Sequence, residues 1–306
     1  MRKIFIKILT KLAEKDKNIY LLTGDLGFSA FEDSAEKFPE RFINCGIAEQ
    51  NMMGVAAGLA LSGKKVYVYS IIPFAVFRCF EQLRNDVVYH NLDVKIIGAG
   101  AGFSYGTSGS SHFAIEDIAV LRVLPNITIL SPGDAVEMEQ LVLQSYKTKN
   151  PTYIRLGKNV EQLHNPSFKI IIGKPSVLKS GKDGVIITTG SYLKTGINIV
   201  KKLAEKGFDF KLISMHTIKP INEKLLIKEI KNNKFLFTIE EHKIIGGLGS
   251  IISEILFKNN LSGIILKTIG IPDEYPFITA SQEYFKKYYK IDEDGILKQI
   301  FKSLKK

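Results

Sequence analysis

The carboxylate of Glu49 stands at the head of a long uncharged segment. It lies in the stretch N-C-G-I-A-E-Q-N-M-M-G, residues 44–54, and no charge occurs from Met52 to Ser62. Because a buried charge without a partner is costly, such a carboxylate is capped, paired or used in chemistry. In the first turn of a helix it would contribute ~0.3 to 1 kcal/mol through the helix dipole. As a chemical group it would hold or transfer a proton.

Other polar side chains that could contact a ligand follow apolar runs. Asp25 lies in the turn T-G-D-L-G, His112 ends a glycine-rich stretch, and Arg155 ends the run P-T-Y-I-R. Their ordinary roles are a turn aspartate, a solvated loop residue and a charge at a strand end. The glycine-rich stretch lacks the G-x-G-x-x-G spacing of a dinucleotide site. We predict no metal site at residues 240–242 (E-E-H), because no further ligands occur at useful spacing.

Alternating strands and helices must position these side chains. In the first half we predict strands at 19–22, 65–69, 94–98, 127–130 and 152–155, and helices at 48–62, 77–91, 115–124 and 135–147. In the second half we predict strands at 185–189, 209–214, 234–239 and 264–271, and helices ending at 206, starting near 249 and at 294–304. This alternation favours parallel sheets covered on both faces. The uncharged helix 48–62 is expected to be buried nearly all round.

The predicted fold is α/β, with two tandem domains that each hold a mostly parallel sheet flanked by helices. We place the first domain at residues 1–160 and the second at 175–306. Residues 161–174 have no clean period and contain Asn165-Pro166, so we predict a linker there.

Composition narrows the class of protein. The chain has 306 residues and a net charge of +11, but its lysines are spread rather than clustered, which argues against nucleic-acid binding. No apolar run is long enough to span a membrane. The two cysteines, Cys45 and Cys79, form no disulfide framework, so we predict a cytoplasmic protein.

The segment G-I-A-E-Q-N-M-M-G-V-A-A-G-L-A, residues 46–60, resembles the signature of the pyrimidine-binding domain of transketolase-type enzymes that depend on thiamine diphosphate. The resemblance implies that Glu49 is catalytic and binds the aminopyrimidine ring of the cofactor. A carboxyl group beside the ring nitrogen favours the imino tautomer, and the cofactor then supplies a carbanion that attacks a carbonyl.

The resemblance also assigns roles to the surrounding segments. An aromatic side chain from I-I-P-F-A-V-F-R stacks on the pyrimidine ring in the family, and both Phe74 and Phe77 are candidates. His112 matches a catalytic, substrate-contacting histidine at the end of a flexible loop. Asp25 matches a loop near the cofactor or the subunit interface, and Arg155 matches a position that binds substrate phosphate.

The loop departs from sugar-phosphate transketolases at two positions. Ser108 stands where those enzymes have an acidic residue four before the histidine, and the position of their second histidine reads roughly Gly100. Ser108 is therefore a candidate substrate contact in place of an acid. The change hints at a specialised sugar, but the sequence identifies neither donor nor acceptor.

The resemblance covers the whole chain but only part of a complete enzyme. The stretch T-I-E-E-H-K-I-I-G-G-L-G-S, residues 238–250, resembles the transketolase C-terminal domain. The G-D-G motif that holds Mg²⁺ and the diphosphate in the family is absent, and no alternative set of oxygen ligands is evident. The resemblance thus implies an N-terminal diphosphate-binding partner subunit that holds Mg²⁺, and a heterotetramer containing two copies of each chain.

The implied function is the C-terminal subunit of a split transketolase, a transferase that moves a two-carbon ketol unit between sugars or sugar derivatives. Two alternatives remain open at this point. One is the β subunit of a 2-oxo-acid dehydrogenase, and the other is a non-catalytic scaffold homologue. Arg155 and the loop that ends in His112 favour the sugar enzymes, and a scaffold has no need of Glu49.

Overall fold

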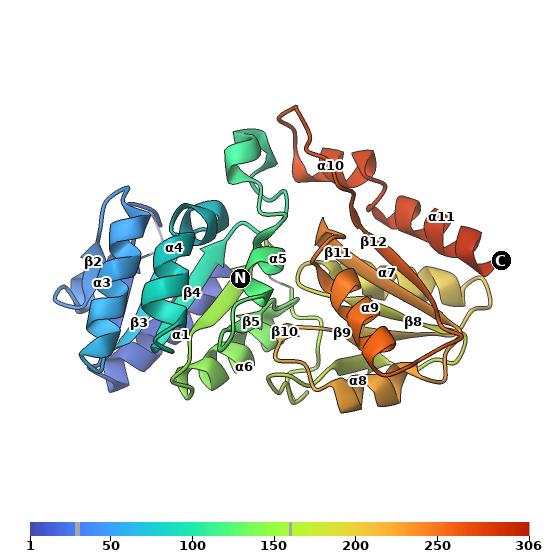
Figure 1. The fold of residues 1–306 in the computed structure, drawn as a ribbon, viewed down its shortest axis with the longest axis horizontal. Helices are drawn as coiled ribbons and strands as arrows, with labels where there is room; N and C mark the ends of the chain where they lie inside the picture. The colour runs from blue at the N-terminus through green and yellow to red at the C-terminus, as the bar shows by residue number, and fades with distance from the viewer. Residues whose placement is uncertain (28–30, 159–160, 306) are drawn as a thin grey trace.

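The computed structural model describes residues 1–27, 31–158 and 161–305, and in it two sheets lie side by side (Figure 1). The first sheet has the strand order β10-β5-β6-β4-β3-β1-β2. All its neighbours are parallel except β10 and β5. Its strands are β1 Ile19–Thr23, β2 Phe42–Asn44, β3 Lys65–Ile71, β4 Val94–Ala99, β5 Thr128–Leu130, β6 Thr152–Leu156 and β10 Thr217–Lys219.

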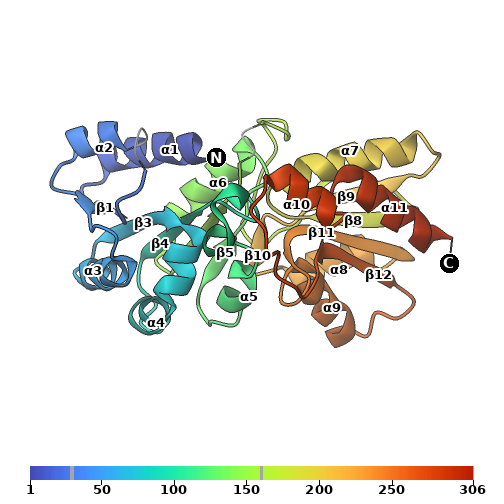
Figure 2. The ribbon, with the colours of Figure 1, turned by 90° about the horizontal axis from the view of Figure 1, so that it is seen from above.

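Helices cover both faces of this sheet, as buried apolar strands require. Figure 2 shows α1, α2 and α6 on one face and α3, α4 and α5 on the other. These helices are α1 Arg2–Lys15, α2 Glu32–Lys37, α3 Glu49–Leu61, α4 Phe80–Gln82, α5 Asp117–Arg122 and α6 Ala135–Tyr146. The helix predicted at 77–91 differs, because it starts earlier and consists largely of wide π turns at Pro73–Arg78 and Leu83–Val88.

The second sheet has the order β12-β11-β8-β9-β7, in which only the β7–β9 pair is antiparallel. Its strands are β7 Ser176–Lys179, β8 Gly184–Thr188, β9 Phe210–Ser214, β11 Phe235–Lys243 and β12 Ile265–Ile271. Its helices are α7 Tyr192–Ala204, α8 Glu223–Ile230, α9 Leu248–Lys258, α10 Gln282–Tyr288 and α11 Glu293–Leu304. The two mostly parallel sheets confirm the predicted fold class.

The two halves share structure at their junction. Strand β10 comes from the second half of the chain but pairs with β5, with Thr217 opposite Leu130. One apolar core cluster contains residues of both halves, including Ile129 and Ile213. The predicted boundary at residue 160 lies outside the described residues, and the limits of the linker stay a prediction.

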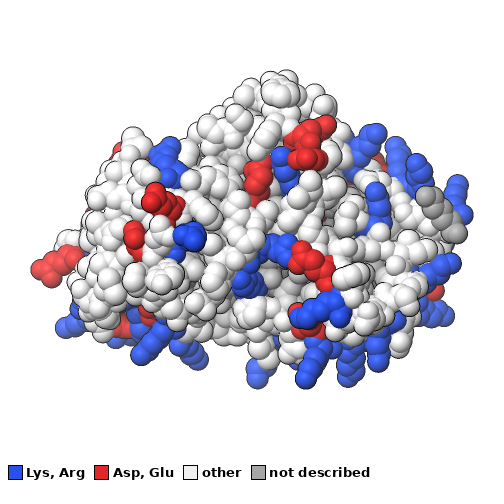
Figure 3. All heavy atoms as spheres, viewed as in Figure 1, with Lys and Arg blue, Asp and Glu red and all other residues white. Residues whose placement is uncertain are grey.

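The surface carries its positive charge broadly. On the face seen in Figure 3, Lys and Arg line the lower edge and the second half of the chain, while the upper protrusion shows few charges. Among the described helices, none is long and apolar enough to cross a membrane.

Candidate functional site

The carboxylate of Glu49 is buried at the start of α3. The chain leaves β2, turns at Gly46 with φ +71°, and enters the helix at Glu49, whose side chain is 1% exposed. Arg78 Nη1 donates to Oε2 at 2.5 Å, and the Ser70 hydroxyl at the end of β3 donates to Oε1 at 3.4 Å. The helix terminus, an ion pair and a hydroxyl thus stabilise a carboxylate that would otherwise be costly to bury.

The turn after β1 lies against this carboxylate. A Cβ added at Gly24 would lie 3.1 Å from Glu49 Oε1, so the residue before Asp25 has to be small. Asp25 has φ +55°, and the amide of Asn44 donates to its carboxylate at 3.0 Å. Asp25 therefore follows directly on the residue that contacts Glu49, but its carboxylate is engaged with Asn44.

Gly24→Ala is expected to lower the free energy of unfolding by about 1–3 kcal/mol, because the new methyl group overpacks against the Glu49 carboxylate. Gly54→Ala is the matched control, since Gly54 lies in α3 and an added Cβ there meets nothing within 4 Å. The control should be neutral or stabilising by up to ~1 kcal/mol, as expected for Ala in a helix. Urea unfolding of both variants measures the difference, and equal stability would contradict the close contact at Gly24.

Aromatic rings form the wall beside Glu49. The guanidinium of Arg78 lies 4.1 Å from the ring centroid of Phe74, and that ring meets His112 edge to face at 5.2 Å. Phe77, 37% exposed, lines with Phe74 and Arg78 a surface cavity of about 320 Å³. The structure therefore brings three predicted residues together next to Arg78: Phe74, Phe77 and His112.

Cys79 adjoins the same pocket but is no candidate nucleophile. Burial first, and the nearby Glu49 carboxylate second, raise the pKa of its thiol to about 12. The reactive form of cysteine is the thiolate. The thiol therefore stays protonated and serves as a core side chain, with its Sγ 3.1 Å from the carbonyl oxygen of Ala75.

Side chains from the second half of the chain contact the loop that carries His112 and fix its position. Glu241 on β11 accepts the backbone N–H of Phe103 at 3.1 Å, and Gln282 of α10 donates to both oxygens of Glu241 at 2.9 Å. The ring of Phe103 stacks on Phe285 of α10, with centroids 4.4 Å apart. The hydroxyl-bearing Ser108 lies on the same loop and is exposed.

Arg155 does not have the environment expected of a phosphate ligand. It is 3% exposed, and its Nε and Nη2 donate to the two oxygens of Asp117 at 2.7 and 3.2 Å. Nη2 also donates to the backbone carbonyls of Ala114 and Glu241. Burial opposes the charge of Arg155, but the Asp117 carboxylate outweighs burial and raises the pKa of the guanidinium. These four bonds use its Nε and Nη2, and binding of substrate phosphate by Arg155 stays a prediction.

The side chains of residues 240–242 (E-E-H) on β11 each contact a different part of the structure. Glu240 accepts the N–H groups of Leu248 and Gly249 at the start of α9, while Glu241 holds the loop and His242 contacts the carbonyl of Lys243. Burial raises the pKa of Glu240 to about 7. These separate directions fit the expectation that the trio does not form a metal site.

Sequence reasoning missed two residues of the site. Arg78 is the fourth residue after Phe74, but the predicted helix began at residue 77, so nothing in the sequence paired the two side chains. Ser70 had no signal, since its contact with Glu49 exists only once β3 and α3 are packed together.

The residues present fit half of a thiamine diphosphate site. A buried carboxylate, a hydroxyl and a half-buried aromatic ring suit an aminopyrimidine. Among the residues that the structure describes, nothing comparable suits the diphosphate and its Mg²⁺. In the described part of the chain the one group with metal-binding spacing is Asp134, Glu137 and His164, and none of these lines the cavity beside Phe74.

Comparisons with known proteins agree with this geometry. The model of the transketolase pyrimidine-binding domain matches residues 1–161, and that of the transketolase C-terminal domain matches residues 173–296. One subunit of an apulose-4-phosphate transketolase from Phocaeicola vulgatus is 37% identical over 100% of this chain and 97% of its own length. A 1-deoxy-D-xylulose-5-phosphate synthase from Halothermothrix orenii is 32% identical over 98% of this chain but only 47% of its own.

A solved structure entitled split gene transketolase, inactive beta4 tetramer, has 35% sequence identity and a TM-score of 0.90. The match covers 99% of this chain and 98% of that one. The domain matches, the level of identity and the position of Glu49 lead to one conclusion. The chain belongs to the transketolase family and contains its pyrimidine-binding and C-terminal domains.

Proposed function

We propose that this chain is the C-terminal subunit of a split transketolase, which transfers a two-carbon ketol unit between sugars or sugar derivatives. The observation that carries the proposal is the buried Glu49 carboxylate, which faces the Phe74–Arg78 wall. Its relatives named as transketolase subunits point the same way. We further infer that the assembly works in the cytoplasm, where the free thiols of Cys45 and Cys79 would persist.

A diphosphate-binding partner subunit supplies the other half of the site. This chain matches about half of the one-piece synthase, and the solved relative is described as inactive when assembled from β chains alone. Helix α3, which presents Glu49, also exposes Val55 and Leu61, although an all-round buried helix was expected. An exposed apolar surface next to a half-formed site marks a subunit interface. The heterotetramer of two chains of each kind covers it and binds Mg²⁺ through the partner.

Each residue of this chain then has a defined task. The cofactor, once bound, supplies the carbon nucleophile, and Glu49 holds the proton at the ring nitrogen of the pyrimidine. In the isolated subunit the ion pair with Arg78 balances the charge of Glu49, and the ring nitrogen shares the carboxylate with Arg78 and Ser70 once the cofactor is bound. His112 and Ser108 contact the sugar from the loop, and Asp25 supports the cofactor side of the pocket.

The direct test combines the two subunits. The purified chain, its diphosphate-binding partner, thiamine diphosphate and Mg²⁺ are incubated with a panel of ketose donors and aldose acceptors. We expect ketol transfer from the mixture and none from either chain alone, with cofactor binding at least ~100-fold weaker without the partner. This factor corresponds to about 2.7 kcal/mol. Equal cofactor affinity with and without the partner would refute the shared site.

Phe74→Ala is expected to weaken cofactor binding by the assembled enzyme about tenfold, and Phe77→Ala by less than about twofold. The half-buried ring of Phe74 lies on Arg78 and His112, whereas Phe77 is more exposed. A stacked aromatic pair contributes ~0.5–1.5 kcal/mol beyond its buried area. Isothermal titration calorimetry, in which thiamine diphosphate is added to the assembled enzyme in the presence of Mg²⁺, measures the affinity of both variants. A larger loss of affinity in Phe77→Ala than in Phe74→Ala would assign the stacking role to Phe77.

A further inference from the structure

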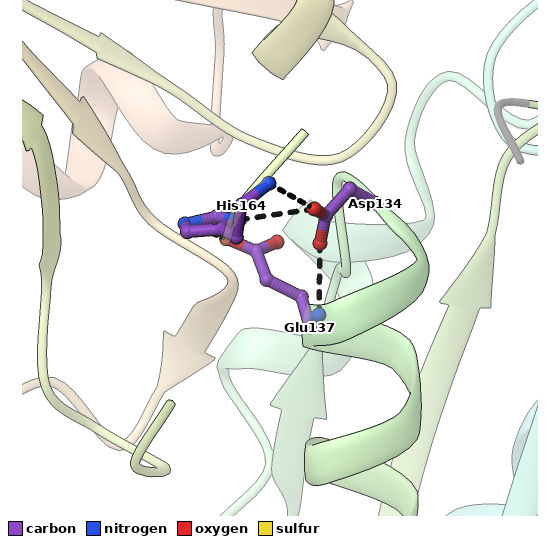
Figure 4. Close-up of side chains that lie close together, drawn as sticks. All are labelled: Asp134, Glu137 and His164. Carbon is purple, nitrogen blue, oxygen red and sulfur yellow. Dashed lines mark hydrogen bonds and ion pairs between the residues drawn. The ribbon is translucent and has the colours of Figure 1, made fainter. Parts of the chain in front are cut away.

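Three acid–base side chains meet inside the protein at the junction of its two halves. Asp134 and Glu137 are at the start of α6, and His164 lies in the segment that leads to the second half (Figure 4). Asp134 and Glu137 are 0% exposed and His164 is 4% exposed. One oxygen of each acid and one ring nitrogen of His164 lie within 4.8 Å of one another.

Helix capping explains only part of this cluster. Asp134 Oδ1 accepts the N–H of Glu137 at 2.8 Å, and Glu137 Oε2 accepts the N–H of Gly133 at 2.6 Å, which is a reciprocal cap. Asp134 Oδ2 accepts the N–H groups of Leu163 and His164. Glu137 Oε1 and both ring nitrogens of His164 remain, and these buried atoms have no well-formed hydrogen bond. A bound ion is one explanation for buried polar atoms of this kind, beside the ion pair between Asp134 and His164.

The separations between these atoms fit a bound ion. His164 Nδ1 lies 3.1 Å from Asp134 Oδ2, and His164 Nε2 lies 3.7 Å from Glu137 Oε1. Two ligands that each lie ~2.0–2.2 Å from a tetrahedral metal are about 3–3.6 Å apart. One ion binds only one nitrogen of an imidazole, so these two distances belong to alternative ligand atoms. One oxygen of each acid and one ring nitrogen lie within 4.8 Å of one another, and the side chains must close to about 3–3.6 Å to coordinate a single ion.

The charge of the cluster leaves room for a bound cation. The only ion pairs of the two carboxylates within residues 1–27, 31–158 and 161–305 are those with His164. Burial raises the pKa of Glu137 to about 7, so near neutral pH a proton on Glu137 and a charged imidazole balance Asp134 when no metal is bound. A divalent cation with a neutral imidazole balances both carboxylates once Glu137 has lost its proton.

We propose that Asp134, Glu137 and His164 bind a first-row divalent metal ion of the zinc type. One imidazole with two carboxylates favours zinc, cobalt or manganese over Mg²⁺ and Ca²⁺, which prefer all-oxygen sites. The Ser214 hydroxyl of β9 lies beside the Glu137 carboxylate and can complete the shell. The ion then joins α6, the connecting segment and the second sheet, so it stabilises the junction and takes no part in ketol transfer.

The experiment uses the full-length chain without an affinity tag, stripped with a chelator and titrated with Co²⁺ and then Zn²⁺. We expect one equivalent of Co²⁺, visible ligand-field bands, and displacement of Co²⁺ by Zn²⁺. Excess Zn²⁺ at about 100 times Kd should raise the Tm by ~5 °C. His164→Gln and Glu137→Gln should each weaken binding at least ~10-fold. The matched controls His90→Gln and Glu139→Gln, both at exposed positions, should bind like the unmodified chain.

Two results would overturn the proposal. The first is that the stripped, unmodified chain binds less than about 0.1 equivalents of metal in the titration and shows no rise in Tm with Zn²⁺. The three side chains would then be an ion-paired cluster in which protonated His164 bridges the two acids. The other is unchanged Co²⁺ binding in both His164→Gln and Glu137→Gln. The thermal shift of the unmodified chain decides the matter even if a variant fails to fold. Neither the metal titration nor the thermal shift involves thiamine diphosphate, so both results are independent of the proposed transferase activity.

Discussion

Glu49→Gln will lower kcat of the assembled transketolase by about 10²- to 10⁴-fold, the range typical of a lost general acid–base group. Glutamine keeps the size of the side chain and can still accept the Ser70 hydroxyl, but it cannot exchange a proton with a ring nitrogen. The 1% exposure of Glu49 excludes water as an effective substitute. Initial rates of ketol transfer at saturating sugar and cofactor measure the effect.

The fold should survive this change. Arg78, the ion-pair partner, is 40% exposed, so its charge can turn to solvent when the carboxylate is lost. Circular dichroism and the Tm should therefore remain close to those of the unmodified chain. Glu81→Gln is the matched control, since Glu81 is exposed on α4 three residues beyond Arg78, and it should retain full activity. Full activity of Glu49→Gln would remove the catalytic assignment.

Local patterns predicted most of the fold. The strands at 65–69, 94–98 and 152–155 appear within two residues of their predicted ends, because continuous apolar runs of this length suit buried parallel strands. Short or weakly apolar elements were missed. Strand β10 has only three residues, and its place beside β5 depends on contacts between the two halves of the chain.

The sequence also predicted some residues of the candidate site and missed others. Glu49, Phe74 and His112 belong to stretches that resemble a family signature, so the amino-acid sequence alone is enough to name them. The partners of buried charges need the folded chain. Asp117 and Arg155 are far apart in sequence, and only the packing of α5 against β6 makes them neighbours. The D-x-x-E pattern of Asp134 and Glu137 reads as an ordinary helix cap, and nothing local connects it with His164.

Asp117→Asn is expected to lower the free energy of unfolding by about 3–5 kcal/mol, the cost of leaving one member of a buried ion pair without its partner. Arg155 would remain as a buried cation, and the Tyr153 hydroxyl, which donates to Asp117 at 2.7 Å, would lose a charged acceptor. This is a large part of the ~5–15 kcal/mol that stabilises a typical domain. Denaturant unfolding measures it. Glu254→Gln is the surface control, because it breaks the solvent-accessible pair between Arg122 of α5 and Glu254 of α9 and should cost less than about 1 kcal/mol.

The double variant Asp117→Leu/Arg155→Met separates a structural role from substrate binding. Apolar side chains of similar volume often replace a buried ion pair at little cost, so the double variant should be more stable than Asp117→Asn alone, which a double-mutant cycle quantifies. If the Arg155–Asp117 pair only stabilises the fold, recovered folding should restore most of the ketol transfer. A well-folded double variant with normal activity on free sugars and a strongly raised KM for sugar phosphates would identify Arg155 as a phosphate ligand. The burial of its guanidinium argues for the first result, because a side chain that is 3% exposed and bonded through Nε and Nη2 has little left to offer a substrate.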